Sequence, residues 1–147
     1  MIIRHFEIKD IKDLKKYRYP DKSDLEILSM INEWNKCGCS GRYFEMFTII
    51  NAGQSVGEIS VYEHTKESVS IGINIFEPFR KKGFATEALN YAINRGKELK
   101  YENAVCLIEK NNKVALNFFI KHGFEFVTEF INPKGIKIVN LKKRISQ

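Results

Sequence analysis

The sequence feature that most constrains the fold is a change in hydrophobic spacing between residues 69 and 99. Four apolar residues alternate with small or polar ones, the period of two typical of a β-strand: Val69, Ile71, Ile73 and Ile75. From residue 85 the apolar residues recur at helical spacing: Ala85, Ala88, Leu89, Ala92, Ile93 and Leu99. The sequence therefore predicts a strand that leads, through the segment 77–84, into an amphipathic helix.

The rest of the chain shows the same two kinds of pattern. Further strands are predicted at 2–8, 43–50, 55–63, 104–108, 124–131 and 136–143, and helices at 11–17, at 23–36 and before Gly123. The apolar residues of the helix at 23–36 are expected to include Leu25, and the strand at 104–108 is expected to be covered on both faces. The order βααβββαβαββ indicates a mixed α/β fold with one sheet, and residues 1–147 are expected to form a single domain.

Several residues have the chemistry of helix ends. Asp10 is expected to cap the first helix, and Ser23 or Asp24 the second, because their side-chain oxygens can accept from free N–H groups. Gly123 is the expected C-cap of the last helix. The segment 37–42, CGCSGR, is expected to be a loop.

The balance of charge favours an anionic partner. The chain has 24 Lys and Arg against 18 Asp and Glu, a net charge of +6. The basic residues are scattered and no nucleic-acid-binding motif is present, so we expect no nucleic acid partner. The sequence shows no signal peptide and no run approaching the roughly 18 apolar residues that span a membrane. We expect a cytoplasmic protein without a membrane partner.

The cysteines do not indicate a disulfide framework, because Cys37, Cys39 and Cys106 are odd in number. The CGC segment also lacks the spaced second pair of ligands that a zinc site needs. From the sequence we expect no metal ion.

The segment EPFRKKGFATEAL, residues 77–89, places three cations where the helix is predicted to begin. Positive charge is unfavourable at a helix N-terminus, which already carries about half a positive charge, unless an anion binds there. Gly83 lets the backbone approach an anion, and the first N–H groups of the helix would point at it. The alternative is a solvated basic turn. Neither G-x-x-x-x-G-K-[ST] nor G-x-G-x-x-G is present.

Two motifs resemble those of the GCN5-related N-acetyltransferase (GNAT) family. Arg80, Gly83 and Ala85 match its acyl-CoA pyrophosphate loop, Q/R-x-x-G-x-G/A, which stands between a strand and a helix. The later segment matches a second motif of an Asn, a small residue, an apolar-aromatic pair and a closing Gly-Phe: Asn112, Ala115, Phe118, Phe119, Gly123 and Phe124.

The resemblance implies transfer of an acetyl group from acetyl-CoA, the cosubstrate, to a primary amine of a small molecule or peptide. It implies a mostly antiparallel sheet in which strands 68–76 and 104–109 splay apart to hold acetyl-CoA. The main chain of Ile73, Asn74 and Ile75 would pair with the pantetheine arm. The amide of Ile75 would have a catalytic role, because it would polarise the acetyl carbonyl as an oxyanion donor.

The remaining cofactor contacts are also implied by the resemblance. The amides of residues 81–86 would hold the pyrophosphate, Asn112 would hydrogen-bond the pantetheine arm, and Phe118 would pack along it. Asn112 could alternatively cap its helix. The full set of expected cofactor-binding residues is Ile73, Asn74, Ile75, Arg80, Lys81, Lys82, Gly83, Phe84, Ala85, Thr86, Asn112, Phe118 and Phe119.

The sequence departs from the family at Phe119, where a tyrosine very often serves as the acid that protonates the departing thiolate. The last tyrosine in the chain is Tyr101, so no shift of frame restores it. A thiol of pKa about 8.5 is already a tolerable leaving group near neutral pH. A non-catalytic acyl-CoA-binding module is therefore the alternative to an enzyme.

The acceptor side is the least specified part of the sequence. Glu109, at the end of a predicted strand, is the candidate catalytic base, with Glu58, Glu77 and His64 as rivals. The resemblance implies that residues 18–43 and 131–135 shape the acceptor pocket, without identifying the amine. The protein is expected to be a monomer or a homodimer.

Overall fold

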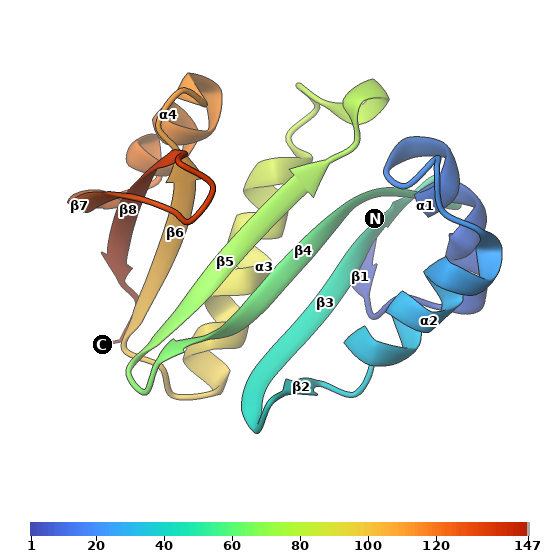
Figure 1. Ribbon diagram of the computed structural model, residues 1–147, viewed down its shortest axis with the longest axis horizontal. Helices are drawn as coiled ribbons and strands as arrows, with labels where there is room; N and C mark the ends of the chain where they lie inside the picture. The colour runs from blue at the N-terminus through green and yellow to red at the C-terminus, as the bar shows by residue number, and fades with distance from the viewer. Residues whose placement is uncertain (147) are drawn as a thin grey trace. The chain divides into compact units, whose positions relative to one another are not determined.

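The computed structural model of the chain describes residues 1–146. Its helices are α1 (Ile11–Tyr17), α2 (Asp24–Trp34), α3 (Phe84–Glu98) and α4 (Lys113–Lys121), with the 3-10 turns η1 (Ile8–Asp10) and η2 (Glu77–Phe79) (Figure 1). Its strands are β1 (Ile2–Arg4), β2 (Gly38–Cys39), β3 (Arg42–Asn51), β4 (Gln54–Thr65), β5 (Ser68–Ile75), β6 (Asn103–Glu109), β7 (Glu125–Ile131) and β8 (Lys137–Arg144). The mixed α/β fold is confirmed.

Hydrogen bonding joins the strands in the order β1-β3-β4-β5-β6-β8-β7, with β2 added to β3. The pairs β1–β3, β3–β4, β6–β8 and β7–β8 are antiparallel. β5 and β6 are parallel over three residue pairs, Ser68–Ser70 with Asn103–Val105. The sheet is therefore mostly antiparallel, as predicted. The loop predicted at 37–42 was wrong in part, because β2 pairs there with the start of β3.

The chain divides into two compact units, Met1–Tyr62 with Ile73–Ala92 and Glu63–Gly72 with Ile93–Gln147. β4, β5 and α3 each contribute residues to both units. The expectation of a single domain stays a prediction.

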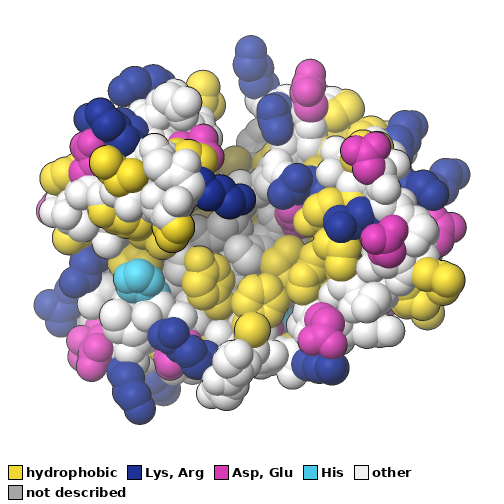
Figure 2. Space-filling model, viewed as in Figure 1, with side chains coloured by type: hydrophobic (Ala, Val, Ile, Leu, Met, Phe, Trp, Pro, Cys, Tyr) yellow, Lys and Arg dark blue, Asp and Glu magenta, His cyan; other side chains and the backbone are white. Residues whose placement is uncertain are grey.

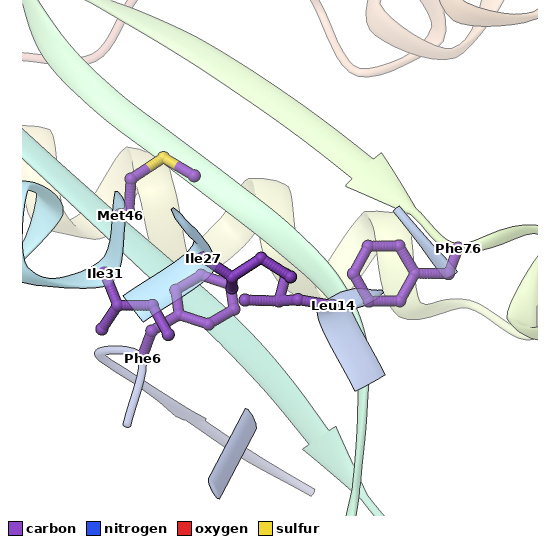
Figure 3. Close-up of a cluster of buried hydrophobic side chains, with 6 residues drawn as sticks. All are labelled: Phe6, Leu14, Ile27, Ile31, Met46 and Phe76. Carbon is purple, nitrogen blue, oxygen red and sulfur yellow. The ribbon is translucent and has the colours of Figure 1, made fainter. Parts of the chain in front are cut away.

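The first unit has a core beneath α1 and α2 (Figure 3). Its buried members are Phe6, Leu14, Ile27, Ile31, Met46 and Phe76. Successive strand residues point to opposite faces, and Phe47, beside Met46 on β3, meets Tyr91 of α3 edge-on, with ring centroids 5.0 Å apart. Within this unit, α1 and α2 therefore cover one face of the strands and α3 the other.

Ser23 caps α2, as predicted. Its hydroxyl accepts from the Glu26 N–H at 3.1 Å, while the Glu26 carboxylate accepts from the Ser23 N–H at 2.9 Å. This reciprocal capping box satisfies two N–H groups that the helix cannot.

The prediction that Asp10 caps α1 was wrong, because its side chain makes no cap hydrogen bond to that helix. The 3-10 turn η1 leads directly into α1, so Asp10 already has helical backbone angles. Its carboxylate turns back and accepts from the Glu7 N–H and from the Arg4 guanidinium, both at 2.8 Å. The bond to Asp10 raises the pKa of Arg4.

Two apolar residues lie outside the faces predicted for them. Leu25 is 78% exposed, because at 3.6 residues per turn it lies on the side of α2 opposite Ile27 and Ile31. Leu107 in β6 is 39% exposed, so the prediction of a strand covered on both faces was wrong at this residue. Its neighbours Cys106 and Ile108 are buried, and burial raises the pKa of the Cys106 thiol.

The surface shows mixed charge on the face drawn in Figure 2, where Lys and Arg side chains are interspersed with Asp and Glu. Among the described residues, no helix has both the length and the apolar character required to cross a bilayer.

Gly57 of β4 leaves no room for a side chain beside β5. A Cβ atom there would lie 2.8 Å from the Asn74 carbonyl oxygen and 3.1 Å from the Ile75 Cα, both backbone atoms that cannot move aside alone. We expect Gly57→Ala to lower the free energy of unfolding by about 1–3 kcal/mol, as overpacking does.

Urea denaturation measures this change. Gly38→Ala is the matched control, since a Cβ at Gly38 would meet its nearest atom at an ordinary 3.6 Å. Equal midpoints for Gly57→Ala and Gly38→Ala would show that the close approach is not a constraint.

Candidate active site

The end of β5 in the first unit is fixed by backbone and aromatic contacts. The N–H of Phe76 donates to the Val56 carbonyl at 2.9 Å. The Phe76 ring stacks on the Tyr17 ring of α1 with centroids 5.8 Å apart. The ring of Phe79, in η2, meets the Tyr17 ring edge-on at 5.2 Å. The strand therefore ends at a defined point, which orients Ile73, Asn74 and Ile75.

Arg80 follows η2 and contacts the strand end. Its Nε donates to the Ile75 carbonyl at 2.8 Å, although most of the residue is exposed. One part of the side chain thus holds the turn, so Arg80 is more than a source of charge for an anion.

The turn into α3 has left-handed backbone at two positions, Lys81 with φ 64° and Gly83 with φ 87°. The second suits glycine, and a Cβ there would have no heavy atom within 4 Å. The first intrahelical bond runs from the Glu87 N–H to the Gly83 carbonyl, so the N–H groups of residues 84–86 precede the helical ladder. An open turn before these N–H groups, with the exposed Lys81 and Lys82 beside it, can hold an anion.

The second motif lies in the second unit and builds the two ends of α4. The Asn112 Oδ1 accepts from the Ala115 N–H at 3.2 Å and caps the helix, the alternative weighed from the sequence. At the other end, the Phe124 N–H donates to the Phe119 carbonyl and the Gly123 N–H to the Ile120 carbonyl, both at 3.0 Å. With Gly123 at φ 92°, this is a Schellman motif. The predicted C-cap was wrong by one residue, because His122 is the C-cap and Gly123 follows directly in the left-handed conformation.

Phe119 has a packing role in that helix end. Its ring meets Phe124 at 5.3 Å, the apolar contact that accompanies a Schellman motif, and the residue is 6% exposed. Phe118 is half-buried, with its ring 5.1 Å from Phe119 and 4.4 Å from His122. Phe118 thus keeps part of its surface available to a ligand, whereas Phe119 is largely enclosed.

The candidate bases differ in how far they are buried. Glu109 and Glu77 are exposed, and His64 is partly buried. Glu58 of β4 is only 7% exposed. The interior position of Glu58 could have been noticed in the sequence, since it stands between Val56 and Ile59 in an apolar run.

Glu58 has one oxygen paired and one without a partner. Arg18, directly after α1, donates from Nε to Oε1 at 2.8 Å, and this bond raises the pKa of Arg18. Burial and then the charge of Glu58 raise the pKa of the neighbouring Tyr19. Among the described residues, the buried Oε2 finds no hydrogen-bond partner. A buried carboxylate oxygen is costly to leave unpaired, so it is a candidate position for a polar ligand.

Most of the chain matches a known protein family. A family model described as an acetyltransferase (GNAT) domain matches residues 1–125. The chain belongs to the GNAT acetyltransferase family. The resemblance stated from Arg80, Gly83 and the Asn112 motif is thereby confirmed, and the use of acetyl-CoA is general to that family.

Solved structures of similar fold cover nearly the whole chain. A ribosomal-protein-alanine N-acetyltransferase from Brucella melitensis has a TM-score of 0.79 at 17% identity, covering 98% of this chain and 99% of its own. A spermidine N-acetyltransferase chimera from Vibrio cholerae and hSSAT has a TM-score of 0.79 at 18% identity, covering 99% of this chain and 96% of its own. The putative acetyltransferase yncA from Salmonella typhimurium was solved with its cofactor acetyl-CoA. It has a TM-score of 0.76 at 12% identity, covering 100% of this chain and 95% of its own. Identities this low show the shared fold alone.

We expect Gly83→Glu to abolish the rise in melting temperature that CoA produces by binding the folded protein. The new side chain would fill the open turn and bring a carboxylate to the position of the phosphates. Differential scanning fluorimetry with CoA measures the shift. Lys81→Ala should reduce it only slightly, since an exposed charge contributes little.

Gly53→Glu is the matched control, because Gly53 also has positive φ, 77°, and open space around its Cβ position. The control carries the same strain and charge and should keep the shift. A full CoA shift in Gly83→Glu would mean that the turn does not hold the phosphates.

Proposed function

We propose that this protein is an N-acetyltransferase that moves the acetyl group of acetyl-CoA to a primary amine by direct attack. The observation that supports this most is the open turn at Gly83, which precedes the N-terminal turn of α3 and carries the family motif. We propose that the N–H groups of residues 81–86, with the side chains of Arg80, Lys81 and Lys82, bind the pyrophosphate.

In this proposal the amine nitrogen forms a bond to the acetyl carbon while the carbon–sulfur bond breaks. The Ile75 amide donates to the carbonyl oxygen as negative charge develops on it. Asn112 contacts the pantetheine arm through its side-chain nitrogen while its oxygen caps α4, and Phe118 packs against the arm. CoA leaves as a thiolate and takes its proton from water, since Phe119 has none to give.

An ammonium group must lose a proton before it can attack, so the reaction needs a base. Glu109 is the residue that the sequence favoured. The burial of Glu58 and its unpaired oxygen support Glu58 instead. We propose Glu58 as the base and keep Glu109 as the alternative.

A screen of amines with detection of free thiol tests the function directly. The panel would contain peptide N-termini, polyamines, amino sugars and aminoglycosides. We expect thiol release above the rate of hydrolysis with at least one class, together with an acetylated product seen by mass spectrometry. Binding of acetyl-CoA without transfer to any amine would favour the non-catalytic acyl-CoA-binding module.

With an active amine in hand, we expect Glu58→Gln to lower kcat/KM by about 10²–10⁴ near neutral pH. The loss should shrink as pH rises toward the pKa of the amine, because the amine then reaches the enzyme already deprotonated. Glu109→Gln is the matched control and should lose little activity. Both variants should keep the CoA-induced thermal shift.

The opposite pattern would identify Glu109 as the base. A loss in Glu58→Gln that stays constant with pH would make Glu58 a positioning residue rather than a base.

Phe119→Tyr returns the hydroxyl that the family usually has. We expect equal or modestly higher thiol release, because the CoA sulfur can partner the new hydroxyl and the ring volume is nearly unchanged. Thiol release and the CoA thermal shift are measured on the same preparation. Loss of the CoA-induced thermal shift would mean that residue 119 has only a packing role, as its contact with Phe124 indicates.

A further inference from the structure

Three side chains that can bind a metal ion come together in the first unit. They belong to His5, which follows β1, to Cys37, which precedes β2, and to Glu45 in β3. One candidate ligand atom from each residue lies within 4.8 Å of those of the other two. This cluster could not be predicted from spacing along the chain, because its members are 32 and 8 positions apart.

Glu45 is the fixed member of the cluster. It is 3% exposed, and the Tyr43 hydroxyl donates to its Oε1 at 2.7 Å. Its Oε2 lies 2.6 Å from the His5 Nε2, in a hydrogen bond in which the ring N–H donates to the carboxylate. The carboxylate therefore has one oxygen held by Tyr43 and the other directed at His5, as in metal sites whose ligands are oriented by outer hydrogen bonds.

His5 is held from the other side. Its ring stacks on Phe47 with centroids 5.0 Å apart and an interplanar angle of 16°. Phe47 and Glu45 are two residues apart on β3 and share a face. Stacking orients the plane of the imidazole, while the side chain remains 46% exposed.

We propose that His5, Cys37 and Glu45 bind one zinc ion, with a water molecule in the fourth position. Imidazole, thiolate and carboxylate are all established zinc ligands, and three of them with one open position is a common arrangement. The ion would also neutralise the charge of a buried carboxylate and a thiolate. Softness of the thiolate disfavours magnesium and calcium, which take oxygen ligands.

The distances require small movements. In a tetrahedral zinc site, neighbouring ligand atoms are about 3.3–3.6 Å apart, given bonds of about 2.0–2.3 Å. The His5 and Glu45 atoms must therefore separate by somewhat under 1 Å, as the proton between them gives way to the larger ion. Cys37 is exposed and stands in a turn, so its side chain can close the remaining gap.

The site would tie together segments that are distant in the chain. An ion bound only by the folded state adds to its stability by mass action. This inference does not rest on the proposed acetyl transfer, because it concerns residues outside the CoA-binding set and is tested by binding alone.

Cobalt(II) is a suitable probe, since it occupies zinc sites and its bond to a thiolate absorbs in the near ultraviolet. We expect the reduced, metal-free protein to bind one cobalt ion per chain with that absorption, and zinc to displace it. Zinc should also raise the melting temperature. Cys37→Ser should remove the thiolate absorption and weaken zinc binding at least tenfold.

Cys39→Ser is the matched control. Cys39 is likewise exposed and lies two residues away, outside the cluster, so this variant should keep both the absorption and the affinity. His5→Gln gives a second test, because glutamine can still donate to Glu45 but removes the imidazole ligand. We expect it to weaken zinc binding as Cys37→Ser does.

Three results would overturn the proposal. The first is absence of cobalt absorption from a thiolate in the wild-type protein. The second is retention of that absorption in Cys37→Ser, which would place the ion at another cysteine. The third is zinc affinity unchanged by His5→Gln. Circular dichroism on each variant shows that the fold is intact, so a loss of binding can be assigned to the ligand removed.

Discussion

The position of Phe76 decides how the first unit presents its functional segments. Its amide closes the backbone contact with Val56, and its ring joins the core beneath α1 through Tyr17. These two contacts stop the extended chain at one residue, and Arg80 then holds the following turn through the Ile75 carbonyl. The start of α3 is thereby set relative to the strand. Without a fixed strand end, neither the amides of residues 81–86 nor that of Ile75 would have a defined direction.

Phe119 packs on Phe124 at the position where the family commonly has a tyrosine. A tyrosine ring could make the same contact with Phe124. The packing requirement alone is therefore met by phenylalanine, which explains why the helix end tolerates the loss of the hydroxyl. The thiol of CoA is acidic enough to leave without a strong proton donor. Phenylalanine at this position therefore lacks the hydroxyl but keeps the packing contact with Phe124 at the end of α4.

The sequence was informative wherever the cause was local. The change of period between residues 75 and 85 predicted β5 and α3, and the Gly123-Phe124 pair predicted the end of α4. Ser23 was one of two adjacent residues predicted to cap α2, because its side-chain oxygen can accept from a free N–H group. These features depend on neighbours within one or two turns, so spacing along the chain describes them well.

Features that depend on distant residues were not predictable in the same way. Asp10 was assigned to the wrong partner because Arg4 competes for its carboxylate. The pairing of Glu58 with Arg18, 40 residues away, appears only when α1 is placed over β4. His5, Cys37 and Glu45 meet through the pairing of β1 and β2 with β3. Charge and ligand type can be read from a sequence, but the choice of partner requires the fold.

The exposure of β7 bears on how the protein behaves at high concentration. Every residue of this edge strand is exposed, including Phe126, Phe130 and Ile131. Such a strand could serve as a template for another chain. Its ladder with β8 is interrupted between Phe126 and Thr128, and Glu129 lies between two of the apolar residues. A bulge twists the edge and a negative charge repels a like strand. The protection of this edge therefore depends on one irregularity and on one acidic side chain, which pairs with Lys110 at 3.0 Å, so a change at either position would leave a continuous apolar edge open to pairing.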